Sequence, residues 1–107
     1  MIIKKFIPLL VVSSLTCMLN ASVYKGQKEY MKKCKSCHGV GSKISMKYTS
    51  DQWKEYFAND GEQLVKIHAK KDVKYFSTER FKKKKKHLLD FFKKFSSDSG
   101  NVPACSD

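Results

Sequence analysis

The chain of 107 residues lacks the patterns that indicate a β protein or several domains. No stretch alternates apolar and polar residues for long enough to predict a strand, and no internal repeat or interior low-complexity linker divides the chain. Apolar residues recur instead at steps of three and four, which is the period of an amphipathic helix. The sequence therefore predicts one small all-α domain of about four helices.

The cysteines are too few, and odd in number in the body of the chain, for a disulfide framework. Cys17 lies in the amino-terminal segment, so the body of the chain has three cysteines, Cys34, Cys37 and Cys105. An odd number of cysteines in an exported protein argues against full pairing. We therefore expect something other than a disulfide to occupy Cys34 and Cys37, whereas the role of Cys105 is unassigned.

The amino-terminal segment has the pattern of an export signal. Two lysines precede a short apolar run, and a small-residue cleavage site ends at Ala21. The run contains Pro8 and is a poor membrane-spanning helix, and an uncleaved membrane anchor is the alternative. The predicted organisation is a signal peptide over 1–21, a helical domain over 22–96 and a C-terminal tail over 97–107. The mature protein is accordingly expected in the periplasm.

Four helices are predicted from periodicity, capping residues and breaks. They cover 24–33, 51–59, 62–71 and 79–95, and a loop is expected over 39–46. Ser22 is expected to cap the first helix and Thr49 or Ser50 the second. Gly61 should separate the second helix from the third, and Thr78 lies in the turn that opens the last.

The most informative pattern is Cys34-Lys35-Ser36-Cys37-His38. Two cysteines three positions apart with a histidine directly behind them form the attachment pattern for c-type haem. At a helix end the thiols can reach the two vinyl groups of a porphyrin, and His38 can ligate the iron from the proximal side. A thioredoxin-like pair would instead need a preceding strand. A zinc site would need two more ligands, for which Cys105 and His68 are available, and a structural disulfide is the last alternative.

The stretch 24–39 resembles the amino-terminal part of a small class I c-type cytochrome. In that family a glycine and an aromatic residue precede the first haem cysteine by eight and four positions, and here those positions hold Gly26 and Tyr30. The resemblance implies that the glycine lets the first and last helices cross closely and that the aromatic residue packs into the crossing. The last helix would complete this contact through Leu88, Leu89 and Phe92. It also implies one covalently attached haem c, wrapped by the helices and used for one-electron transfer.

The expected cage around the haem is aromatic. Its predicted members are Trp53, Tyr56, Phe57 and Phe76, and the last helix would add a stripe of Phe81, Leu88, Phe92 and Phe95. These side chains are sufficient to exclude water from most of a porphyrin.

The chain has no methionine after Met46, whereas the family usually supplies a distal methionine well downstream of the haem motif. Met46 follows the motif by only eight residues, so a histidine is the preferred sixth ligand. His68 is that candidate, because it shares one helix face with Leu64 and Val65. Met46 is the second choice, and an open or lysine-ligated iron is the remaining alternative. His87 is expected to be exposed.

The net charge is +12, and the densest charge in the chain is the run of five consecutive lysines Lys82–Lys86. Such a run forms either a solvated helix face or a docking patch for redox partners with acidic surfaces. Binding to nucleic acid is not expected behind an export signal, and peripheral contact with an anionic membrane surface is an open alternative.

Taken together, these patterns predict a periplasmic one-electron carrier that is not an enzyme. One alternative is a haem-based binder or sensor of small ligands such as gases, with an open or weakly held distal site. The other is a zinc-stabilised interaction module.

Overall fold

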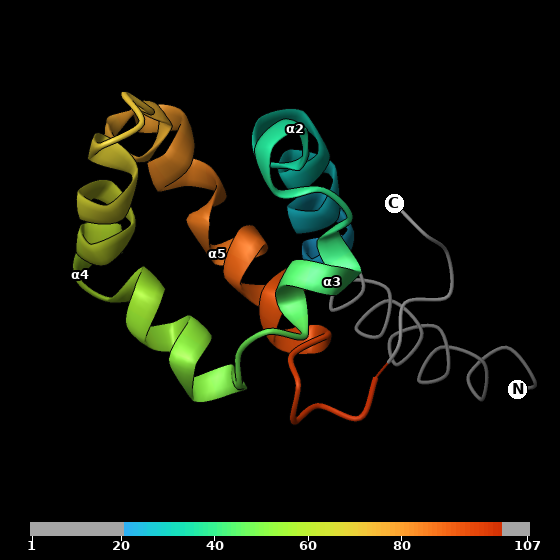
Figure 1. The fold of residues 1–107 in the computed structure, drawn as a ribbon. Coiled ribbons are helices and arrows are strands. Elements are labelled where there is room, and N and C mark those ends of the chain that lie inside the picture. The colour runs from blue at the N-terminus through green and yellow to red at the C-terminus, as the bar shows by residue number, and fades with distance from the viewer. Residues whose placement is uncertain (1–20, 102–107) are drawn as a thin grey trace, which may run out of the picture.

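The computed structural model describes residues 21–101 (Figure 1). This part of the chain is all-α and contains no strand. Its elements are a helix over 21–33, α2 (Lys35–His38), α3 (Gly41–Ser45), α4 (Ser50–Ala69), the 3-10 helix η1 (Tyr75–Ser77) and α5 (Glu79–Lys94). The predicted all-α class is therefore confirmed. The predicted signal peptide, apart from Ala21, and Cys105 lie outside the described residues.

The prediction of about four helices is corrected to about five. The segment 39–46 was expected to be a loop, but it contains the five-residue helix α3. Two glycines suggested a loop there, and the N-cap position holds Val40, which makes no side-chain capping bond. The helix is nonetheless useful to the fold, because the carbonyl of Ser45 at its end accepts a hydrogen bond of 3.0 Å from the Trp53 indole.

α4 consists of two helical segments joined by a sharp break. Ala58 has an extended ψ of 153°, and Asn59, Asp60 and Gly61 follow with φ values of 53°, 56° and 76°. These positive φ values interrupt the right-handed helix. The break predicted at Gly61 is thus confirmed, and the two segments correspond to the helices expected over 51–59 and 62–71.

Side-chain caps fix two of the predicted helix starts. Thr49 and Gln52 form a reciprocal capping box at the start of α4, with bonds of 3.2 and 2.9 Å. Thr78 caps α5 by accepting from the backbone N–H of Phe81 at 3.3 Å. The prediction for Ser22 was wrong, because the first helix already includes this residue. Its hydroxyl instead donates to Asp90 of α5 at 2.6 Å, which ties the first helix to the last.

The first helix and α5 cross in direct backbone contact at Gly26. A Cβ atom at this position would overlap the carbonyl oxygen of His87 and lie 2.9 Å from the Cβ of Phe91. One turn later Tyr30 is fully buried, and its ring centroid lies 5.8 Å from those of Phe91 and Phe92. The close crossing expected at Gly26 and Tyr30 is therefore present. Phe91 was not expected to contribute to it.

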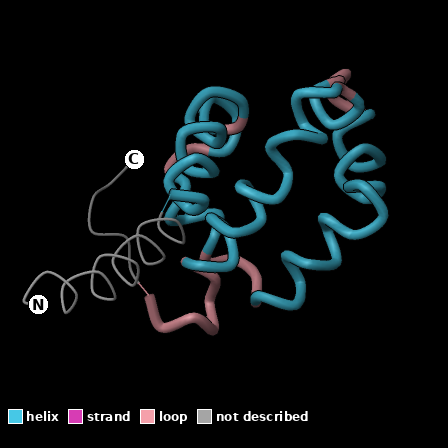
Figure 2. Tube along the Cα trace, turned by 180° about the vertical axis from the view of Figure 1, so that it is seen from behind, coloured by secondary structure: helices cyan, strands magenta, loops and turns pink. Residues whose placement is uncertain are grey.

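The buried core follows from this crossing and from the packing of α4 on α5. It consists of Tyr30, Trp53, Phe57, Leu64, Phe81, Leu88, Phe91 and Phe92. Trp53 stacks on Phe92 with ring centroids 4.0 Å apart, whereas Tyr56 and Phe95 are only half-buried. Figure 1 shows α2 and α4 on opposite sides of α5, and Figure 2 shows the same arrangement from behind. Within residues 21–101, no helix has the length and hydropathy needed to cross a membrane.

The predicted tail is folded over its first five residues. The N–H of Ser97 donates to the carbonyl of Tyr48 at 3.0 Å, and the N–H of Ser50 donates to the carboxylate of Asp98 at 2.9 Å. These bonds fasten the chain after α5 to the start of α4.

The variant Gly26→Ala is expected to lower the free energy of unfolding. In an ordinary helix interior this change stabilises by about 1 kcal/mol. Here the added methyl group would overlap the backbone of α5, and such overpacking costs about 1–3 kcal/mol or more. Thermal unfolding followed by circular dichroism measures the difference. Lys32→Ala, at an exposed position of the same helix, is the control and should change little; equal stability of Gly26→Ala and wild type would contradict the crossing.

Candidate functional site

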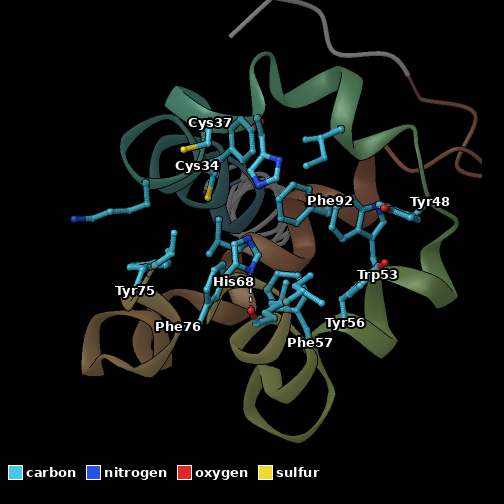
Figure 3. A pocket seen from close by; sticks show the side chains of 18 residues that line it. Cys34, Cys37, Tyr48, Trp53, Tyr56, Phe57, His68, Tyr75, Phe76 and Phe92 are labelled. Atoms are coloured by element: carbon cyan, nitrogen blue, oxygen red, sulfur yellow. Dashed lines mark hydrogen bonds between the residues drawn. The ribbon is translucent and has the colours of Figure 1, made fainter. Parts of the chain in front are cut away.

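A cavity of about 840 Å³, including its open mouth, lies between the amino-terminal helices and α4 (Figure 3). The wall is predominantly aromatic and aliphatic, and all four residues of the predicted cage contribute to it: Trp53, Tyr56, Phe57 and Phe76. Leu64, Leu88 and Phe92 add further apolar surface. Such a wall can surround a flat, largely apolar ligand and keep water away from it.

The cysteine–histidine motif forms a single helical turn at the edge of this cavity. The carbonyl of Cys34 accepts hydrogen bonds from the N–H groups of Cys37, at 3.2 Å, and His38, at 3.0 Å. Gly39 then ends α2 with a φ of 76°, a left-handed conformation that glycine adopts without strain. The buried Tyr30 donates its hydroxyl to the carbonyl of Gly39 at 2.6 Å and so anchors the turn to the core. All three motif side chains line the cavity.

The two motif cysteines are free thiols in different environments. Cys34 is half-buried and Cys37 is exposed. Burial, followed by the negative charge of Glu29 and the neighbouring Cys37, raises the pKa of Cys34 to about 12. Redox-active cysteines of the thioredoxin type require a lowered pKa, because the thiolate is their nucleophile. The environment of Cys34 therefore gives no support to that interpretation.

His68 lies on the wall opposite the motif and is held in a defined orientation. Its Nδ1 lies 2.7 Å from the carbonyl oxygen of Leu64, one turn earlier in α4. Because a carbonyl can only accept, Nδ1 carries a proton, and in the neutral ring Nε2 is then the nitrogen with the free lone pair. The ring of Phe76 packs against the imidazole at a centroid distance of 4.4 Å. A histidine oriented by a backbone carbonyl in this way is typical of metal ligands.

His38 and His68 have the separation expected of two imidazoles that share one metal ion. Their ring centroids lie 6.0 Å apart, with an angle of 72° between the planes. Two metal–imidazole bonds of about 2.0–2.1 Å and two ring radii, each roughly 1.1 Å for ring bonds near 1.33 Å, give about 6.3 Å. His38 is exposed as a residue, but partial desolvation of its ring, followed by the nearby charges of His68 and Lys47, lowers its pKa and so favours the neutral ring that ligates metals. The residues present thus fit an iron porphyrin.

The other ligand candidates lie in less favourable places. Met46 follows α3 with 51% of its surface exposed and does not line the cavity. His87 was expected to be exposed, but it is half-buried against the first helix, with Nδ1 2.9 Å from the hydroxyl of Ser22, and it does not line the cavity. Burial, followed by the charges of Lys25 and other neighbours, lowers its pKa. Among lysines, Lys33 lines the cavity.

A buried carboxylate beside the cavity was missed by the sequence analysis. Glu29 is 2% exposed and binds Arg80 through two hydrogen bonds, of 2.7 and 2.9 Å. The hydroxyl of Tyr75, which lines the cavity, donates to the same carboxylate at 2.5 Å. Burial alone would raise the pKa of Glu29, but the hydrogen bonds from Arg80 and Tyr75 and the charges of Arg80 and Lys84 hold it below its ordinary value. The sequence did contain a signal that Glu29 is buried. Glu29 follows Gly26 by three residues, and positions i and i+3 share one face of a helix, so both face α5.

Within residues 21–101, no three His, Cys, Asp or Glu side chains are grouped so that they alone could hold a metal ion. The zinc interpretation also needs Cys105, which lies outside that range. No protein-family model matches the chain, and neither a curated protein nor a solved structure does. The residues of the cavity therefore carry the functional conclusion.

Proposed function

We propose that this chain is a periplasmic monohaem c-type cytochrome that carries single electrons between redox proteins. The observation that supports it most is the composition of one cavity. Cys34, Cys37 and His38 stand on one wall, His68 stands on the other, and aromatic side chains form most of the remaining surface. A cysteine–histidine turn of this kind facing an apolar cavity is what attachment of a porphyrin requires.

Each motif side chain has a separate task in this proposal. The thiols of Cys34 and Cys37 would hold the porphyrin through thioether bonds to its vinyl groups, an addition that would release no atoms and need no oxidant. His38 and His68 would ligate the iron through their ring nitrogens. When bound, the haem supplies a one-electron iron couple.

The protein controls how electrons enter and leave. Trp53, Phe57 and Phe92 are buried and keep water from the interior of the cavity, whereas Cys37 and His38 are exposed at its mouth. A donor protein would give one electron at this exposed edge, and an acceptor protein would later remove it. The carrier itself changes no substrate, so it is not an enzyme.

The lysine run supports a cationic docking surface for acidic partners, although not all five lysines are free. Lys82 pairs with Glu79 at 3.3 Å and Lys85 pairs with Asp60 of the break in α4. Lys83 and Lys86 are exposed. Surface charge of this kind accelerates encounters with acidic partners and loses its effect at high salt.

Mass spectrometry of the protein, exported by a host with haem-ligation machinery, tests the proposal. The expected mass is that of residues 22–107 plus one complete haem, because the addition loses no atoms. The reduced protein should also show the absorption spectrum of haem c. A colourless product with the mass of the polypeptide alone would contradict the proposal, and bound zinc in that product would favour the interaction module.

A further inference from the structure

We infer that the ion pair of Glu29 with Arg80, joined by Tyr75, sets the redox potential of the haem site. This inference rests on the proposed function. It assigns a task to a buried carboxylate that neither attaches the porphyrin nor ligates its iron.

The cluster joins the two walls of the cavity. Glu29 lies on the helix over 21–33, five residues before Cys34. Tyr75 belongs to η1, and the next residue, Phe76, packs against His68. The hydrogen bond from Tyr75 to Glu29 therefore connects the wall that bears the thiols with the wall that bears the opposing histidine.

The two charges of the ion pair differ in their exposure to water. The Glu29 side chain is 2% exposed, whereas 44% of the Arg80 side chain is exposed. Water screens the guanidinium much more than the carboxylate, so the two charges do not cancel inside the cavity. The carboxylate also lies beside the cavity wall, because the Tyr75 hydroxyl that donates to it at 2.5 Å belongs to a residue that lines the cavity.

The sign of the effect follows from the iron couple. The oxidised site carries one more positive charge than the reduced site, so a buried negative charge stabilises the oxidised form and lowers the midpoint potential. Glu29→Gln removes this charge and keeps a side chain of similar shape, and it should raise the potential. Arg80→Gln removes the positive charge and should lower the potential, by a smaller amount because the guanidinium is partly solvated.

Spectroelectrochemical titration of the haem-loaded variants measures both shifts. The matched control is a second acid–base pair, Glu62 and Lys66 on α4, joined at 3.0 Å with side chains 54% and 72% exposed. Glu62→Gln and Lys66→Gln should leave the potential nearly unchanged, since water screens both groups. Arg80→Lys keeps the charge but loses the two-pronged bond, and it should stay close to the wild-type potential.

The sign pattern separates an electrostatic role from a purely structural one. Loosening of the cavity would shift the potential in the same direction for Glu29→Gln and Arg80→Gln, and that result would overturn the inference. Shifts no larger than those of the control pair would overturn it as well. If Glu29→Gln does not load haem, a lowered potential in Arg80→Gln with an unchanged one in Arg80→Lys supports the inference, and any other result contradicts it. A wild-type protein without haem would instead overturn the proposed function itself.

Discussion

The double variant Cys34→Ala, Cys37→Ala should be exported without covalently bound haem. Both thiols belong to one turn of helix and both line the cavity, so the two replacements remove the two thiols that residues 21–101 present to it. The expected result is complete loss of the added haem mass in denatured protein, where a merely ligated haem dissociates. Each single variant should retain one thioether at most.

The same double variant should also be much less stable than the haem-loaded wild type. A group that binds only the folded state adds its binding free energy to the stability of that state. The haem would occupy a cavity lined largely by aromatic residues, and apolar walls without contents lose contact energy. Thermal unfolding followed by circular dichroism should show a lower and broader transition for the variant.

Ser36→Ala is the matched control for this experiment. Ser36 lies in the same turn between the two cysteines, and its side chain is exposed and does not line the cavity. Its replacement should leave both the haem content and the unfolding transition close to those of the wild type. Retention of the haem mass by the double variant would exclude the motif as the attachment site.

Features of this fold that depend on neighbours in sequence could be predicted from the sequence. The cap at Thr49 is made with Gln52 and the cap at Thr78 with Phe81, each three residues away. The break at Gly61 is likewise local. α3 was missed because it is only one turn long and has no capping side chain at its start. Tertiary contacts, rather than its own signals, must hold so short a helix.

In the candidate site, too, the local features could be predicted from the sequence and the long-range contacts could not. The turn from Cys34 to His38 is fixed by its own spacing, and His68 was placed on an inward face by helical periodicity. The distance of 6.0 Å between the rings of His38 and His68, in contrast, depends on how α4 packs, and no local sequence pattern determines that packing. The partners of Glu29 are 46 and 51 residues away, so periodicity could place this carboxylate inside but could not name Tyr75 and Arg80.

If the proposed function holds, the variant His68→Ala should keep its covalent haem but lose the iron ligand that His68 would supply. The imidazole is held by Leu64 and Phe76 on the wall opposite His38, and 6.0 Å separates the two imidazole centroids. The wild-type reduced protein should therefore bind carbon monoxide slowly and incompletely, whereas the variant should bind it at once and completely. The ferric absorption and electron paramagnetic resonance spectra should change with it.

A methionine at position 68 would replace the imidazole ligand rather than remove it. His68→Met, if its sulfur reaches the iron, should raise the midpoint potential, because thioether ligation favours reduced iron relative to imidazole. Met46→Leu and His87→Ala are the controls, since neither side chain lines the cavity, and both should preserve the wild-type spectra. A spectral change in Met46→Leu with none in His68→Ala would transfer the ligand assignment to Met46. Immediate, complete binding of carbon monoxide by the wild type would instead favour a ligand binder or sensor, because an electron carrier needs both axial positions held.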